Sequence, residues 1–304
     1  MSAADNRAAL RRAIEGWNQG DREAYLKLYD SRAVLHGYQG VGPGLDGIRQ
    51  FYGGFWSAFP SSRIDLDQVV AEGDKAACSF TLAGLHLGEF NGIPATGKQV
   101  AISGITVLRF ANGQCVERWS QADFLGLLQQ LGVIPSPAPQ PSAQQHPGPD
   151  RQPVDSKARS RRASKASENK ALVRWFFKEA QTRHKLAAVD RFLSPDFVDY
   201  SSAMYGTPPN RDGVKQFFQV LYAGLPDVRA ITHDQVSEGD IVVTRKTLRG
   251  THRGQFMGAP PTGKVISISV IDMLRVSGGK ITGHWAAIDR LGLLTQLGLA
   301  PPAG

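Results

Sequence analysis

The stretch Gly92–Gly104 reads GIPATGKQVAISG, and a closely similar stretch, GAPPTGKVISISV, runs from Gly258 to Val270, 166 residues later. In both, glycine and proline precede alternating residues, a pattern typical of a turn that opens a β-strand. The same shift aligns 46–132 with 212–298 without a gap. Because solenoid repeats are much shorter, this period indicates two duplicated domains.

The segment between the two copies differs from both of them in composition. We predict a first domain at residues 1–135, a linker at 136–169 and a second domain at 170–304. The linker is rich in Pro, Gln, Ser and basic residues and cannot bury enough apolar surface to fold. Residues 136–170 contribute +4 of the net charge of +8, and the rest of the chain has no basic run with interleaved aromatics. This distribution argues against a nucleic-acid partner.

Each copy contains helical patterns first and strand patterns afterwards. In the first copy, apolar residues recur at helical spacing in 10–17, 25–29 and 48–59. After Pro60 the period changes to two, which predicts two pairs of strands that turn at EGD (72–74) and NGQ (112–114). Helices followed by a curved antiparallel sheet of four or more strands predict an α+β domain with a cone-shaped apolar interior.

Several classes of protein are not expected from this sequence. The chain has no run of eighteen apolar residues and no apparent secretory signal, so we expect no membrane partner. Cys78 and Cys115 have Thr244 and Ile281 as counterparts, which suggests small core residues of a reduced cytoplasmic protein. No phosphate-binding loop, dinucleotide fingerprint or metal-ligand spacing occurs, so we expect no cofactor and no metal.

The residues around the quoted hairpins resemble a known family. LHLGEFNGIPATGKQVAISGITVLRFANGQCVERWSQADFLGLLQQLG (85–132) and THRGQFMGAPPTGKVISISVIDMLRVSGGKITGHWAAIDRLGLLTQLG (251–298) are similar to the signature of SnoaL-like polyketide (ester) cyclases. The resemblance implies two tandem cone-shaped domains of the cystatin-like, nuclear transport factor two-like fold. It also implies cofactor-independent chemistry in which an aspartate near the end of the last strand is the acid and base of an intramolecular aldol closure. Asp123 and Asp289 match that position.

Two interpretations of these aspartates remain open. If the period of two holds along the last strand, Asp123 shares a face with Trp119, and Asp289 with Trp285. An aromatic wall beside a carboxyl raises its pKa and suits it to proton transfer. Each aspartate also precedes a short helix, FLGLLQQLG or RLGLLTQLG, where it would be a good N-cap with a lowered pKa.

The remaining candidate residues would bind substrate beside these tryptophans. His86 and His252 end the strand before the hairpin and either orient a substrate carbonyl or act as hydrogen-bonded structural residues. Three further candidates differ between the copies. These are His36, whose counterpart is Tyr200; His284, whose counterpart is Arg118; and Asp272, whose counterpart is Thr106. Asp272 interrupts an apolar stripe, where a carboxyl needs a partner or a purpose. Neither copy carries the full family set, so one copy could be catalytically weak.

Three functional hypotheses follow. The leading one is a cyclase, or a related lyase or isomerase, acting on an apolar, enolisable polyketide-like ester. The second is a non-catalytic ligand-binding or scaffolding protein, whose two cones pair within the chain or whose chains form a homo-oligomer. The third is a cone-fold hydrolase or isomerase with an additional carboxylate that activates water.

Overall fold

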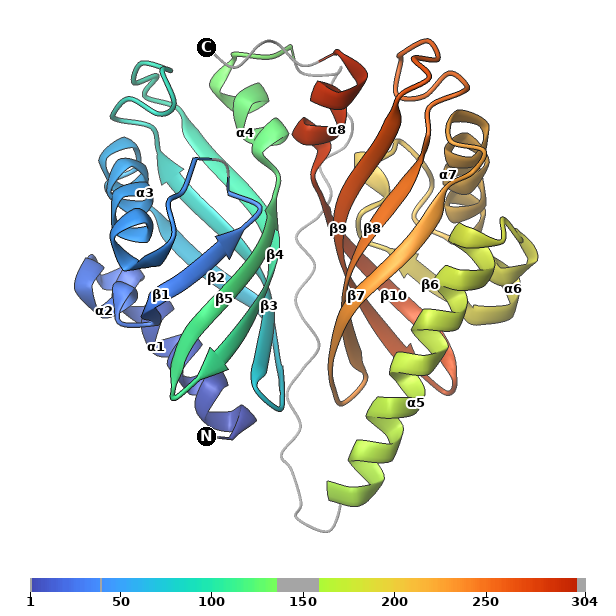
Figure 1. Cartoon of the computed structure of the whole chain (residues 1–304), viewed down its shortest axis with the longest axis horizontal. Coiled ribbons are helices and arrows are strands. Elements are labelled where there is room, and N and C mark those ends of the chain that lie inside the picture. Colours follow the sequence, from blue (N-terminus) through green and yellow to red (C-terminus); the bar gives the residue numbers. More distant parts are fainter. Residues whose placement is uncertain (1, 39, 136–158, 300–304) are drawn as a thin grey trace. The chain divides into compact units, whose positions relative to one another are not determined.

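The computed structural model describes residues 2–38, 40–135 and 159–299. The chain divides into two structural units, one within residues 2–135 and one within residues 159–299. Each unit consists of helices and one five-stranded sheet (Figure 1). The expected pair of tandem α+β cone domains is therefore confirmed.

The first domain begins with helices and ends with a short helix after the sheet. Its elements are α1 (Ala3–Gln19), α2 (Arg22–Leu26), β1 (Tyr29–His36), α3 (Gly44–Ala58), β2 (Arg63–Glu72), β3 (Lys75–Leu85), β4 (Gln99–Ala111), β5 (Gln114–Ala122) and α4 (Phe124–Leu131). The strand order is β1-β5-β4-β3-β2, and β1 is parallel to β5 while the other pairs are antiparallel. The helical pattern predicted through Tyr29 ends early, because Tyr29 begins β1.

The second domain repeats this topology. Its elements are α5 (Arg159–Phe177), η2 (Lys178–Thr182), α6 (Ala187–Phe192), β6 (Leu193–Asp199), η3 (Ser202–Met204), α7 (Arg211–Gly224), β7 (Arg229–Glu238), β8 (Ile241–Thr251), β9 (Val265–Ser277), β10 (Lys280–Ile288) and α8 (Arg290–Leu297). The strand order β6-β10-β9-β8-β7 matches that of the first sheet. The duplication read from the sequence is therefore a duplication of the whole fold.

Helix α5 begins at Arg159, ahead of the predicted domain boundary at residue 170. Asn169 is buried, and its Nδ2 donates to the Gly239 carbonyl at 3.4 Å. Asn6 of α1 makes the corresponding bond to Gly73 at 3.2 Å. Residues 159–169 are therefore helical, and α5 is a longer counterpart of α1, whereas 136–158 of the predicted linker lie outside the described residues.

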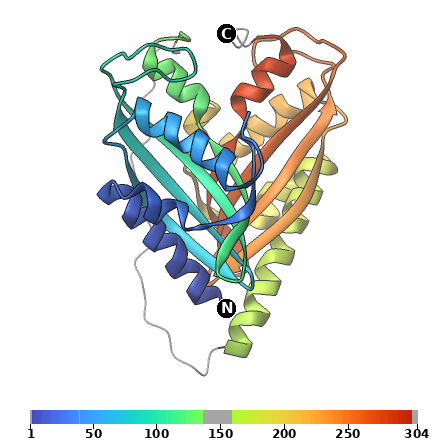
Figure 2. The same ribbon diagram turned by 60° about the vertical axis from the view of Figure 1, so that its left-hand side comes forward.

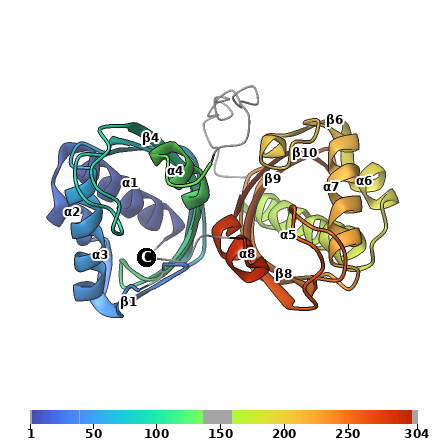
Figure 3. The ribbon, with the colours of Figure 1, turned by 90° about the horizontal axis from the view of Figure 1, so that it is seen from above.

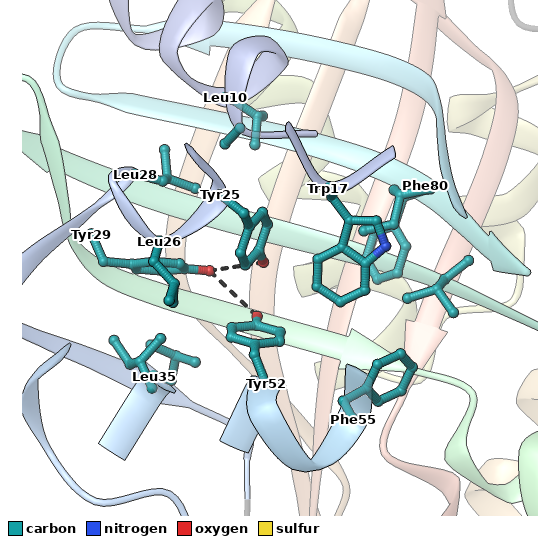
Figure 4. Packing of buried hydrophobic residues seen from close by; sticks show 14 of the residues in the cluster. Leu10, Trp17, Tyr25, Leu26, Leu28, Tyr29, Leu35, Tyr52, Phe55 and Phe80 are labelled. Carbon is teal, nitrogen blue, oxygen red and sulfur yellow. Dashed lines mark hydrogen bonds between the residues drawn. The ribbon is translucent and has the colours of Figure 1, made fainter. Parts of the chain in front are cut away.

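The core of the first domain lies between the helices and one face of the curved sheet (Figures 2 and 3). Helix α1 packs on β2 and β3, and α3 packs on β1. Trp17 of α1 is buried and packs edge-on against Tyr25 at 4.9 Å between ring centroids. Its indole N–H donates to the Ser62 carbonyl at 3.1 Å. Aromatic side chains thus line the inside of the cone (Figure 4).

A β-bulge in the last strand decides which side chains face that core. Phe110 of β4 pairs with Cys115, but Arg109 pairs with Glu117, so Val116 is the extra residue. In β10, the shift between Ile281 and Gly283 is equivalent. An extra residue moves every later side chain to the opposite face of the sheet.

The bulge reverses the predicted alternation of inward-facing and outward-facing side chains in the part of β5 that follows it. Cys115 is fully buried, yet Arg118, Ser120 and Ala122 line the interior in place of Trp119. In a regular strand, Cys115 and Trp119 would have shared one face. This shift changes the composition of both interiors.

Candidate functional site

The second domain has a cavity between its sheet and helices. It contains about 560 Å³ of space not filled by atoms, its mouth included. Most of its lining is aromatic or aliphatic, including Phe176, Phe197 and Phe218. Its polar lining residues are Gln181, Asp199, Tyr205, Lys246, Asp272 and His284. An apolar cavity with a few convergent polar groups is the usual form of a small-molecule site.

His284 lies between two carboxylates in this cavity. Its Nδ1 is 3.1 Å from Asp199 Oδ1, and its Nε2 is 3.0 Å from Asp272 Oδ1. The Lys246 ammonium lies 2.5 Å from Asp272 Oδ2 and 3.5 Å from the centroid of the Phe177 ring. With His284 protonated, the cluster has two positive and two negative charges and is neutral overall.

The electrostatics of the cluster favour its charged forms. Burial alone would lower the pKa of His284, but the carboxylates of Asp199 and Asp272 outweigh it and raise this pKa to about 9. Burial would likewise raise the pKa of Asp272, but Lys246 and His284 hold it below its usual value. His284 is therefore an imidazolium at neutral pH, able to donate a proton.

Two oxygen atoms in the cavity are available to accept hydrogen bonds from a ligand. Asp199 Oδ1 accepts from His284 and from the Ser201 backbone N–H, while its Oδ2 has no hydrogen-bond partner among the described residues. Gln181 Oε1 is buried and likewise has no partner within the described ranges. A substrate can thus reach an acceptor oxygen beside the imidazolium.

The two aspartates that the family resemblance indicated lie elsewhere. Asp123 Oδ1 accepts from the Gly126 backbone N–H at 3.0 Å, and Asp289 Oδ1 accepts from the Gly292 backbone N–H at 2.8 Å. They are the N-caps of α4 and α8, and neither is among the residues that line the two domain cavities. The sequence left two interpretations of these aspartates open, and the structure shows the one in which each caps a helix.

Trp119 and Trp285 also lie off the cavities, because the bulge turns them to the other face. His36 stacks on Trp119 with 4.9 Å between ring centroids, and Tyr200 stacks on Trp285 at 4.4 Å. His36 also contacts Glu117 at 3.3 Å. These residues form an aromatic pair on the outer face of each sheet and do not wall a pocket.

His86 and His252 hold the hairpin with which the sequence reading began. His86 is fully buried, and its Nδ1 lies 3.0 Å from Thr96 Oγ1 and accepts from the Thr96 backbone N–H at 3.3 Å. His252 makes the same contacts with Thr262. Neither histidine is among the residues that line the two domain cavities, and each makes hydrogen bonds within its hairpin.

Of the predicted site residues, the structure therefore brings only Asp272 and His284 together in a cavity. Sequence reasoning missed Asp199 and Lys246. Lys246 carried a signal, since it stands between Thr244 and Leu248 at an inward-facing position of β8. A lysine at such a position needs a buried partner, and Asp272 is that partner.

Comparisons with known proteins agree with this architecture. The family model for SnoaL-like polyketide cyclase matches residues 7–131 and 171–297. The chain therefore belongs to the SnoaL-like polyketide cyclase family, and each domain is one copy of it.

The relatives include two ester cyclases. Nogalonic acid methyl ester cyclase of Streptomyces nogalater is 27% identical over 111 residues, which cover 36% of this chain and 83% of that protein. Aklanonic acid methyl ester cyclase DauD of Streptomyces sp. strain C5 is 28% identical over 140 residues, which cover 43% of this chain and 83% of that protein. Among solved structures, IdmH from Streptomyces antibioticus is 33% identical, with a TM-score of 0.39. The match covers 43% of this chain and 98% of the IdmH chain.

Among the residues that the structure describes, no helix combines the length and the apolar character needed to cross a membrane.

Proposed function

We propose that the second domain is a cofactor-independent ester cyclase that closes a ring by an intramolecular aldol reaction. The observation that carries this proposal is the contact of 3.1 Å between His284 Nδ1 and Asp199 Oδ1 in an apolar cavity. A base and an acid side by side are what the removal of a C–H proton and the protonation of a carbonyl oxygen require.

In this mechanism Asp199 Oδ2 takes a proton from a carbon that lies between two carbonyl groups of the substrate. The enolate carbon then attacks a ketone carbon of the same molecule, so that a C–C bond forms and the ketone C=O double bond becomes a single bond. The ketone oxygen takes the proton from His284 Nδ1. The Asp199 carboxyl group then returns a proton to Nδ1, which lies 3.1 Å from Oδ1 of Asp199, and the protein is restored.

The other two charged groups position the imidazole. Asp272 accepts from Nε2 and fixes the ring with its Nδ1 toward Asp199. Lys246 in turn holds the second oxygen of Asp272. Gln181 Oε1 can accept from a substrate hydroxyl, which would orient the ring system.

The charge balance of the cluster favours an ester over a free acid. The four groups already sum to zero charge, so a carboxylate in this cavity would be a buried charge without a partner. A methyl ester carries no charge and keeps the adjacent carbon acidic. The names of the two relatives, both methyl ester cyclases, agree with this substrate class.

The test uses the purified full chain with nogalonic acid methyl ester and aklanonic acid methyl ester, the compounds in the relatives' names, and follows ring closure by chromatography. Asp199→Asn and His284→Gln should each lower kcat by about 10² or more, since each removes one partner of the proton transfer. Turnover that survives both substitutions, or a wild-type chain that converts neither ester, would contradict the proposal.

Asp289→Asn is the matched control. Asparagine caps a helix about as well as aspartate, so folding should be preserved. Because Asp289 accepts from a backbone N–H outside the cavity lining, this variant should retain wild-type turnover. Loss of activity in Asp289→Asn with activity retained in Asp199→Asn would instead support the aspartate indicated by the family resemblance.

A further inference from the structure

The first domain has a cavity of its own, which the proposed reaction does not use. It contains about 780 Å³ of space not filled by atoms, its mouth included, and most of its lining is apolar. The one cation among its lining residues is Arg118, and no aspartate or glutamate lines it. Burying a charge costs free energy unless the charge is paired, and Arg118 faces this apolar cavity without a carboxylate partner.

The hydrogen bonds of Arg118 leave part of its guanidinium unused. Nη1 lies 2.9, 2.7 and 2.7 Å from the hydroxyls of Tyr25, Tyr29 and Tyr52, which converge on one point (Figure 4). Nε donates to Thr106 Oγ1 at 3.0 Å. The guanidinium carbon lies 5.8 Å from the centroid of the Tyr38 ring, but the Nη2 hydrogens have no hydrogen-bond acceptor among the described residues and can bind a ligand.

The tyrosine hydroxyls also have a hydrogen to spare. Tyr29 Oη lies 3.1 Å from Tyr25 Oη and 3.3 Å from Tyr52 Oη. These two contacts use at most two of the three hydroxyl hydrogens, and the guanidinium of Arg118 has no acceptor that could take the third. Ser120 Oγ lines the same cavity, is buried and has no hydrogen-bond partner in the described part of the chain. Arg118 Nη2, Ser120 Oγ and one tyrosine hydroxyl can therefore each donate a hydrogen bond to a ligand.

The tyrosines do not supply the missing negative charge. Burial raises the pKa of Tyr29 and of Tyr52 well above the usual value, although the charge of Arg118 acts in the opposite direction. Both hydroxyls therefore stay protonated and neutral. The positive charge of Arg118 is left for a ligand to balance.

We propose that the first domain binds an aromatic or polycyclic carboxylate, whose carboxylate group accepts from Arg118 Nη2, Ser120 Oγ and the spare tyrosine hydroxyl. Guanidinium and carboxylate form strong charge-assisted hydrogen bonds, particularly when both are removed from water. The apolar walls, among them Trp17, Phe55 and Phe80, match an aromatic body.

These donors are specific to the first domain. The residues at the equivalent positions of the second domain are Phe218 for Tyr52, Ala286 for Ser120 and His284 for Arg118. The carboxylate site is therefore not a general property of this duplicated fold. It adds a binding activity to the chain that does not depend on the proposed cyclase reaction.

The experiment compares a matched acid and ester on the full chain. The probes are anthracene-9-carboxylate and its methyl ester, and binding is measured by isothermal titration calorimetry at pH 7. The acid should bind at least ten-fold more tightly than the ester. Arg118→Gln should weaken acid binding roughly ten- to a hundred-fold and leave ester binding within two-fold, because a hydrogen bond to a buried charge is lost only for the acid.

Two milder variants keep the test valid if Arg118→Gln does not fold, as judged by circular dichroism. Ser120→Ala breaks no hydrogen bond of the protein, and Tyr52→Phe keeps the aromatic ring. Each variant should weaken binding of the acid several-fold and should change binding of the ester only slightly. Asp289→Asn should leave acid binding unchanged, since Asp289 caps a helix of the other domain and does not line its cavity. Equal affinity for acid and ester in the wild type, or equal losses for both ligands in the variants, would overturn the proposal.

Discussion

At the residue scale, one position determines the chemistry of each cavity. It is the residue directly before the tryptophan of the last strand, His284 in the second domain and Arg118 in the first. A histidine can gain and lose a proton near neutral pH, whereas an arginine remains charged. The domains thus have the same fold but place groups of different chemistry at the same point.

The raised pKa of His284 predicts a pH-dependent contribution to stability. Its pKa is about 9 in the folded domain against an ordinary value of 6.5, so the native state favours the protonated ring. The contribution, on the order of 3 kcal/mol, is present below pH 6.5 and lost as the pH rises through 9.

Compared with His284→Gln, the wild-type second domain should therefore be most stabilised near pH 6, and this advantage should shrink by pH 9.5. The measurement is pulse-labelling hydrogen exchange in urea, read on peptides of β9 and β10. A difference in unfolding free energy that stays constant from pH 6 to pH 9.5 would contradict the assigned pKa.

The sequence predicted part of this site. Asp272 could be recognised because a carboxyl in an apolar stripe stands out, and His284 because it matches the family residue before the tryptophan. Asp199 could not be found by periodicity, because it ends a short edge strand whose parallel pairing with β10 joins residues far apart in the chain. Only tertiary structure brings Asp199 and His284 together.

At the element scale, the β-bulge explains the main error of the sequence reading. The helices and the antiparallel strands were predictable because their apolar periodicity is regular. The register of the strands could not be predicted in this way. One extra residue, Val116, turns every later side chain of β5 to the opposite face of the sheet. Trp119 and Asp123 were therefore expected inside, while the side chains of Arg118 and Ser120 are the ones that line the cavity.

The capping role of Asp123 leads to a stability prediction for α4. Asp123→Ala should destabilise the first domain by about 1 kcal/mol, whereas Asp123→Asn should change its stability by only a few tenths. Urea unfolding of the two variants, read on first-domain peptides, provides the check. A loss in Asp123→Asn as large as that in Asp123→Ala would show that the negative charge, and not the cap, is what the helix requires.

At the scale of the whole molecule, the two cavities differ in net charge. The second holds a neutral set of two cations and two anions, and the first holds a cation without a carboxylate. We therefore expect the chain to place neutral esters in one domain and carboxylates in the other.

Hydrogen exchange can test this division on the intact chain. Anthracene-9-carboxylate at about 100 times its Kd should slow exchange in peptides around Tyr52 and Arg118 by up to roughly a hundred-fold, as a ligand that binds only the native state does. Peptides around Lys246 and His284 should exchange at their unliganded rates. Protection in the second domain without protection in the first would contradict the assignment of ligands to domains.

The two cysteines provide a natural reporter of one half of the chain. Both belong to the first domain, both are buried, and burial raises the pKa of each thiol to about 12. Cys78 lines the first-domain cavity, whereas Cys115 does not. Because only the thiolate reacts readily, alkylating reagents should modify Cys115 no faster than the first domain opens. The rate of Cys115 alkylation therefore measures the opening of that domain in the native, unmutated chain, while the second domain, which has no cysteine, gives no signal.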